Sequence, residues 1–122
     1  MARILIAEDE RDIRDLVEFT LKYAGHDVFK ASNGAEAVEL APSVKPDLIL
    51  MDVVMPGLNG FQATRQLTRD AETKDIPVII VTTKDQETDR VWGLRQGAKD
   101  FLTKPVSEKV LMEKINAALE LV

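Results

Sequence analysis

Residues 48–60 read LILMDVVMPGLNG: four apolar side chains in a row, then Asp52, then a loop containing proline and glycine. A short apolar run without alternation is typical of a strand that is covered on both faces, as in a parallel sheet. Further runs of this kind, two clear and two weaker, occur at 4–7, 78–81, 27–31 and 98–102. We therefore predict five buried strands.

The segments between these runs carry helical patterns. Residues 13–24 place apolar or small side chains at i, i+3, i+4 and i+7, which forms one stripe along a helix. Pro42 and Pro46 are expected to bracket the loop that ends the second helix. Val91 and Leu94 are expected to form the buried stripe of the fourth helix. Because crossovers between parallel strands are right-handed in nearly all cases, helices should cover both faces of the sheet.

Length and composition fit one α/β domain over residues 1–122, in a reducing compartment. The chain has no cysteine, which excludes disulfides. Its net charge of −5 disfavours direct binding to nucleic acid. The N-terminal apolar run, residues 4–7, is too short for a signal peptide or a membrane span. We expect a soluble cytoplasmic protein without membrane insertion.

The strands end in residues suited to phosphate chemistry. The first run is followed by Glu8 and Asp9, the third by Asp52, the fourth by Thr82, and the fifth by Lys104. In an open parallel sheet, ligands bind beyond the carboxyl ends of the strands. These side chains are therefore expected to share one site.

The expected cluster of carboxylates needs a cation. Two carboxylates about 4 Å apart repel by about 4 kcal/mol at an effective dielectric near 20. Mg²⁺ fits, because it takes oxygen ligands from one or two carboxylates, several waters and a phosphate oxygen. Asp52 could then attack phosphorus while Lys104 neutralises the transferred oxygens and Thr82 donates a hydrogen bond to one of them.

Four motifs resemble the receiver domains of two-component response regulators. They are ILIAEDE at 4–10, LILMDVVMPGLNG at 48–60, VIIVTT at 78–83 and DFLTKP at 100–105. The resemblance covers the whole chain, with all four motifs in order and at family spacing. It implies a flavodoxin-like (βα)5 fold, a doubly wound parallel five-stranded sheet in the order 2-1-3-4-5.

The resemblance also implies a role for each site residue. Asp52 resembles the phosphoacceptor and Lys104 the lysine that pairs with the phosphoryl group. Three further positions resemble the metal shell: Asp9 as a direct ligand, Glu8 acting through water, and Val54 through its backbone carbonyl.

Two more positions resemble the family's switch, and one its proline corner. Thr82 resembles the switch hydroxyl. Phe101 stands where the switch aromatic is commonly tyrosine, and it can rotate inward but offers no hydroxyl. The bond between Lys104 and Pro105 is expected to be cis.

The implied function is a signalling switch in a two-component or chemotaxis-like phosphorelay, with Mg²⁺-dependent self-phosphorylation and autodephosphorylation as its only chemistry. A histidine kinase is the implied phosphodonor, and the face made by the fourth helix, fifth strand and fifth helix is the implied output surface. From about Asp52 onward, and most clearly at 59–93, the chain is similar to stand-alone receivers of type IV pilus chemosensory systems, which suggests a pilus motor or chemosensory protein as the effector. No attached DNA-binding or catalytic output domain is expected, and the protein is expected to be a monomer or a weak phosphorylation-linked dimer.

Three other readings of the residues remain open at this stage. A phosphatase of the haloacid dehalogenase type also uses a strand-end aspartate, but it needs a second acid where Val54 stands. A flavin-binding module of the same fold class is disfavoured by the acidic loop after the first strand, which would repel the flavin phosphate. A degenerate receiver would bind partners without phosphorylation.

Overall fold

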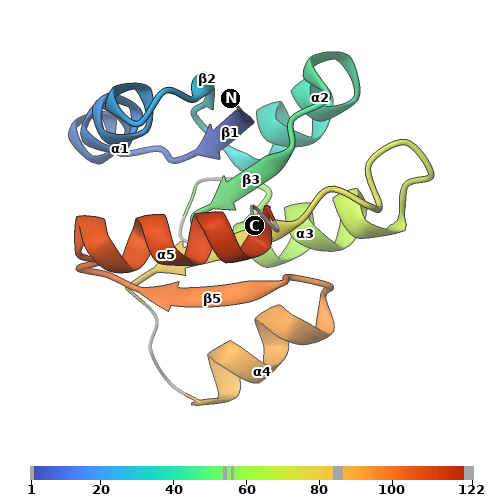
Figure 1. Ribbon diagram of the computed structural model, residues 1–122. Coiled ribbons are helices and arrows are strands. Elements are labelled where there is room, and N and C mark those ends of the chain that lie inside the picture. Colours follow the sequence, from blue (N-terminus) through green and yellow to red (C-terminus); the bar gives the residue numbers. More distant parts are fainter. Residues whose placement is uncertain (1, 54, 56, 84–86, 120–122) are drawn as a thin grey trace.

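The structure of the chain is a computed structural model that describes residues 2–53, 55, 57–83 and 87–119, in which five strands alternate with five helices (Figure 1). In chain order they are β1 (Arg3–Ala7), α1 (Arg11–Tyr23), β2 (Asp27–Ala31), α2 (Gly34–Val44), β3 (Leu48–Met51), α3 (Gly60–Arg69), β4 (Val78–Thr82), α4 (Glu87–Arg95), β5 (Asp100–Thr103) and α5 (Glu108–Ala118). Among these described residues, no helix combines the length and the apolar character needed to cross a membrane.

The strands form one parallel sheet in the order β2-β1-β3-β4-β5. β3 is central, with Leu50 paired to Ile6 of β1 on one side and to Ile79 of β4 on the other. The predicted flavodoxin-like topology is therefore confirmed. The strand order reverses direction at β1 and β3, so the switch point lies where Glu8 and Asp52 emerge.

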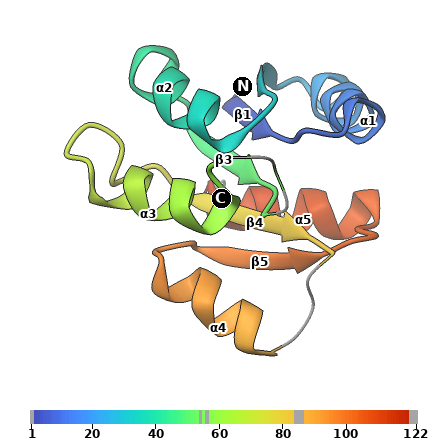
Figure 2. The same ribbon diagram turned by 180° about the vertical axis from the view of Figure 1, so that it is seen from behind.

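Helices cover both faces of the sheet, as Figures 1 and 2 show from opposite sides. On one face, α1 and α5 bury Leu21, Leu111 and Ile115 against the strands. On the other face, α2 and α3 bury mainly alanines and Leu67. β3 is buried along its whole length, and its apolar side chains belong alternately to the hydrophobic core on one face of the sheet and to the core on the other.

Two predicted boundaries are wrong. Pro42 lies inside α2, which continues to Val44 and ends at Lys45 in a left-handed conformation (φ 52°). A proline removes one backbone donor, but burial of Ala41 beside it holds the helix together. The fifth strand begins at Asp100 rather than at residue 98.

Two predicted helical stripes also differ from the structure. In α1, Leu16 is 66% exposed, and within the stripe only Leu21 is fully buried. In α4, Val91 and Leu94 are exposed, and Gly93 is the buried residue among those of the helix whose burial is described, 88–95. A Cβ at Gly93 would lie 3.0–3.2 Å from Ile80, Phe101 and Phe61, so this helix packs through a backbone surface.

Candidate functional site

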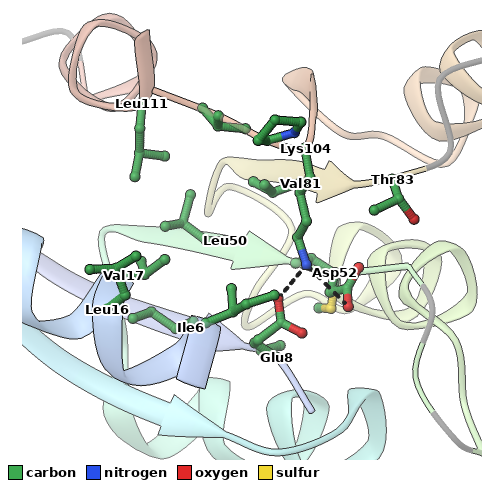
Figure 3. Close-up of a pocket in the computed structure, with 15 residues that line it drawn as sticks. Ile6, Glu8, Leu16, Val17, Leu50, Asp52, Val81, Thr83, Lys104 and Leu111 are labelled. Atoms are coloured by element: carbon green, nitrogen blue, oxygen red, sulfur yellow. Dashed lines mark hydrogen bonds and ion pairs between the residues drawn. The ribbon is translucent and has the colours of Figure 1, made fainter. Parts of the chain in front are cut away.

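The predicted residues meet at one edge of the sheet because all the strands run in the same direction (Figure 3). At three of these residues, a backbone hydrogen bond extends the pairing of the strands by one residue beyond the end of the strand. The amide of Glu8 donates to the Ala31 carbonyl at 3.0 Å, and the amide of Asp52 donates to the Ala7 carbonyl at 3.0 Å. The amide of Lys104 donates to the Thr82 carbonyl at 2.7 Å. The sheet itself therefore fixes the positions of these side chains.

The loop after β3 is tightly folded against Asp52. The amide of Gly60 donates to the Val53 carbonyl at 3.1 Å, and a Cβ at Gly60 would lie 2.0 Å from the carbonyl oxygen of Asp52. Asn59 caps α3 through a reciprocal pair of hydrogen bonds with Gln62. The start of α3 thus holds the backbone of Asp52 in place.

Three acids converge at this edge. One carboxylate oxygen from each of Glu8, Asp9 and Asp52 can be chosen so that all three lie within 4.8 Å of one another. Glu8 and Asp52 are buried, at 4% and 7% exposure, whereas Asp9 is exposed. Such a set matches the hard oxygen donors that Mg²⁺ prefers, with an open side for water. The predicted fourth contributor, Val54, lies outside the described residues.

Lys104 is the cation of this cluster. Its Nζ lies 2.6 Å from Glu8 Oε1 and 3.7 Å from Asp52 Oδ2 (Figure 3). The peptide bond between Lys104 and Pro105 is cis. Among the described residues, this one ammonium faces three carboxylates, which leaves them with excess negative charge that a divalent cation would neutralise.

The protonation of Asp52 reflects this imbalance. Burial is the main cause that raises the pKa of Asp52, to about 7, and the hydrogen bond and the negative charge of Glu8 raise it further. Lys104 and the Val53 amide, which donates to Asp52 Oδ1 at 2.8 Å, act in the opposite direction. A nucleophilic carboxylate must be ionised, so a second positive charge would favour the reactive form.

The two predicted switch residues are both buried. Thr82 is fully buried at the end of β4, and Phe101 is 2% exposed in a cluster with Phe61 and Ile80. The guanidinium of Arg90 lies 5.8 Å from the centre of the Phe101 ring. The inward position that the sequence allowed for Phe101 is therefore the one in this structure.

An apolar cavity of about 440 Å³ opens beside the acids, between α1 and α5 (Figure 3). Its apolar wall includes Val17, Leu50 and Leu111, and its polar end is formed by Asp52 and Lys104 together with Glu8. Leu16, which is exposed on α1, is also one of its lining residues.

Sequence reasoning missed two features at the site and one farther along α1. The guanidinium of Arg14 donates to the Glu8 carbonyl at 3.0 Å, although nothing in the sequence distinguishes Arg14 from a solvated arginine. Thr83, to which the sequence assigned no role, lines the cavity. Phe19 and Tyr23 stack on the exposed face of α1 with ring centres 6.4 Å apart.

Comparisons with known proteins agree with this geometry. Residues 4–116 match the response regulator receiver domain family. Protein PilH of Pseudomonas aeruginosa is 64% identical over 119 residues, which are 98% of this chain and 98% of PilH. The structure of the chemotaxis protein CheY4 of Vibrio cholerae is 30% identical with a TM-score of 0.91, over 97% of this chain and 98% of CheY4.

A second solved structure bears on the metal. The receiver domain of the sensor histidine kinase PA1611 from Pseudomonas aeruginosa is 29% identical with a TM-score of 0.90, over 98% of both chains. In that structure a magnesium ion is coordinated in the active site cleft. The family match decides against the phosphatase and flavin-binding alternatives. The chain belongs to the response regulator receiver domain family and is a signalling receiver of a two-component system.

Proposed function

We propose that Asp52 accepts a phosphoryl group from the phosphohistidine of a kinase, in a Mg²⁺-dependent reaction within one receiver domain over residues 1–122. The observation that carries this proposal is the convergence of Asp52, two further acids and Lys104 at one edge of the sheet. A surface aspartate with an ordinary structural role has no need of this arrangement.

Three side chains would hold the metal. Asp9 is exposed and free to bind directly, Asp52 offers its carboxylate, and Glu8 is placed to act through water. The Val54 carbonyl is the fourth expected ligand. When bound, Mg²⁺ supplies positive charge that neutralises the transferred oxygens and the crowded acids.

The protein's own side chains would carry out the remaining steps of the reaction. The ionised Asp52 carboxylate attacks phosphorus, so that a P–O bond forms while the P–N bond to the donor histidine breaks. The Lys104 ammonium pairs with the transferred oxygens, and the Thr82 hydroxyl donates a hydrogen bond to one of them. Water later hydrolyses the acyl phosphate, which is the autodephosphorylation that we expect of this domain.

A direct test is phosphorylation by acetyl phosphate followed by intact-protein mass spectrometry. The wild-type protein with Mg²⁺ is expected to gain one phosphoryl group, and Asp52→Asn is expected to gain none. Chelation of Mg²⁺ should prevent the gain as well. Asp47→Asn, a change at the opposite end of β3, is the matched control and should behave as wild type. Full labelling of Asp52→Asn would refute the assignment.

The output surface is proposed to be the face made by α4, β5 and α5. On α4, Val91, Trp92 and Leu94 are all exposed although they are large and apolar. Phe101 lies directly beneath this helix, against Gly93, so a movement of Thr82 and Phe101 would change how the helix sits. Only a difference in affinity between the two states can transmit the signal.

The similarity to PilH supports a partner in a type IV pilus chemosensory system, either a pilus motor component or a chemosensory protein. The protein is proposed to act in the cytoplasm as a monomer or a weak phosphorylation-linked dimer. Its phosphorylated state would be read through protein–protein contact.

The exposed apolar stripe on α1, which leads from the site toward the opposite end of the sheet, supports docking of the kinase along this helix. Leu16, Phe19 and Tyr23 are 66–84% exposed, and Leu16 also lines the cavity that reaches Asp52. Phe19→Ala is expected to slow phosphotransfer from the kinase about tenfold, since truncating an interface anchor costs more than about 1 kcal/mol. The measurement is the rate of phosphotransfer from the purified, labelled kinase.

A small donor provides the control for this prediction. Labelling of Phe19→Ala by acetyl phosphate should match wild type, because that donor needs no docking surface. Leu94→Ala, which truncates an exposed apolar side chain on α4, should leave the kinase rate unchanged. Equal slowing with both donors would mean that Phe19 supports the fold rather than the docking.

A further inference from the structure

The nearest partner of Lys104 is Glu8 rather than the phosphoacceptor. The distance from Nζ is 2.6 Å to Glu8 Oε1 and 3.7 Å to Asp52 Oδ2. The side chains of this pair are 15% and 6% exposed, so the contact is largely shielded from water. A hydrogen-bonded ion pair in such a place is much stronger than one on the surface.

The pair also joins strands that are not neighbours. In the order β2-β1-β3-β4-β5, two strands separate β1 from β5. At about 4.8 Å per interval, the two backbones lie about 14 Å apart. Two long side chains can close this distance, and they meet above β3, where Asp52 emerges (Figure 3). Glutamate at position 8 supplies one methylene of reach more than aspartate would.

Glu8 is itself anchored from several directions. Its amide donates to the Ala31 carbonyl, and its own carbonyl accepts the Arg14 guanidinium at 3.0 Å. Its second carboxylate oxygen accepts the Glu10 amide at 3.3 Å. Two of these bonds fix the Glu8 backbone and the third restrains its carboxylate, whereas lysine loses much rotamer freedom whenever it is ordered.

We infer that Glu8 is a positioning residue for Lys104: it holds the ammonium beside Asp52 before the phosphoryl group arrives. This inference rests on the proposed function of Asp52 and Lys104. It assigns to Glu8 a role that is separate from any contact with a metal-bound water. Because Lys104 is ordered in advance, less ordering cost remains when the phosphoryl oxygens bind.

A double-mutant cycle tests the inference. The variants are Glu8→Gln, Lys104→Met and the double variant, and the measurement is beryllofluoride affinity by calorimetry at saturating Mg²⁺. Glu8→Gln is expected to weaken affinity about tenfold when Lys104 is present and less than twofold in the Lys104→Met background. Equal losses in both backgrounds would overturn the inference and leave Glu8 with a metal role alone.

Asp9→Asn is the matched control, because Asp9 belongs to the same acidic cluster. Asp9→Asn should change beryllofluoride affinity by the same factor in the wild-type background and in the Lys104→Met background. Coupling of Lys104 to Asp9 as strong as to Glu8 would indicate a general charge effect and would also overturn the inference. If wild-type protein with Mg²⁺ bound no beryllofluoride, the proposed function itself would fail, and the positioning role with it.

A second readout needs neither metal nor phosphoryl analogue. In chelator, urea unfolding of wild type, Glu8→Gln, Lys104→Met and the double variant measures the coupling between Glu8 and Lys104 in the metal-free domain. Each single variant leaves one buried charge without its partner, so the double variant should be less destabilised than the two singles added together. Additive losses would contradict the pairing on which the inference rests.

Discussion

In magnesium-free buffer at pH 8, Asp52→Asn is expected to raise the free energy of unfolding. The folded-state pKa of Asp52 is raised to about 7, mainly by burial and then by Glu8. The native protein thus keeps this proton to a higher pH than the unfolded chain, and the associated stability is lost as pH rises from about 4 through 7. The rise from 3.8 to about 7 spans about three pKa units, and at about 1.4 kcal/mol for each unit the variant should gain on the order of 4 kcal/mol. Urea denaturation in chelator measures the gain.

The pH dependence separates this effect from a generic benefit of asparagine. At pH 4, Asp52 is protonated in the folded state and only about half ionised in the unfolded chain, so most of the charge effect is gone and the two proteins should unfold at nearly the same urea concentration. Excess Mg²⁺ at pH 8 should stabilise wild type much more than Asp52→Asn, because the metal neutralises the acids. Asp12→Asn, at an exposed carboxylate in the first turn of α1, should change stability little. A gain of equal size at pH 4 would contradict the charge argument.

The positions of the site residues could be predicted from the sequence because each follows a buried strand. Apolar runs without alternation identify parallel strands, and parallel strands bring their carboxyl ends to the same edge. This reasoning was enough to bring Glu8, Asp52 and Lys104 together. It required no knowledge of helix packing, since the ladder hydrogen bonds at the strand ends fix all three backbones.

The helices were predicted less accurately, for reasons that the structure makes clear. A periodicity argument assigns burial to large apolar residues, but α4 packs through Gly93, where a side chain would collide with Ile80 and Phe101. In α1, Leu16 fits the stripe, yet it lies at the rim of a cavity that α5 leaves open. Pro42 was interpreted as a helix breaker, although one lost backbone bond is tolerated where the adjacent Ala41 is fully buried.

The internal order of the site was also beyond sequence reasoning. Motif spacing places one lysine and three acids together, but it cannot say which acid the lysine contacts. That choice depends on side-chain length and on the distance between β1 and β5, and both favour Glu8. The support of Glu8 by Arg14 likewise depends on where α1 places this side chain, 3.0 Å from the Glu8 carbonyl.

Gly60→Ala is expected to destabilise the protein by more than about 3 kcal/mol, at the upper end of the range for overpacking. The new Cβ would lie 2.0 Å from the carbonyl oxygen of Asp52 and 2.8 Å from the Val53 Cα, and both are backbone atoms that cannot rotate away. To make room, the start of α3 must move away from β3 and lose the bond from the Gly60 amide to the Val53 carbonyl. Urea denaturation gives the loss of stability, and calorimetry should show weaker beryllofluoride binding because Asp52 moves too.

Gly57→Ala separates crowding from backbone conformation in the same loop. Gly57 adopts a left-handed conformation (φ 76°), but a Cβ there would meet nothing within 4 Å. Its replacement should therefore cost only about 1 kcal/mol, the usual penalty for an L-residue in this region, and should leave the geometry of Asp52 intact. At Gly60 the situation is reversed: its φ is not left-handed, so the whole free-energy cost of the substitution to alanine is steric. If Gly60→Ala proved as mild as Gly57→Ala, the close contact between α3 and β3 would not be what holds Asp52 in place.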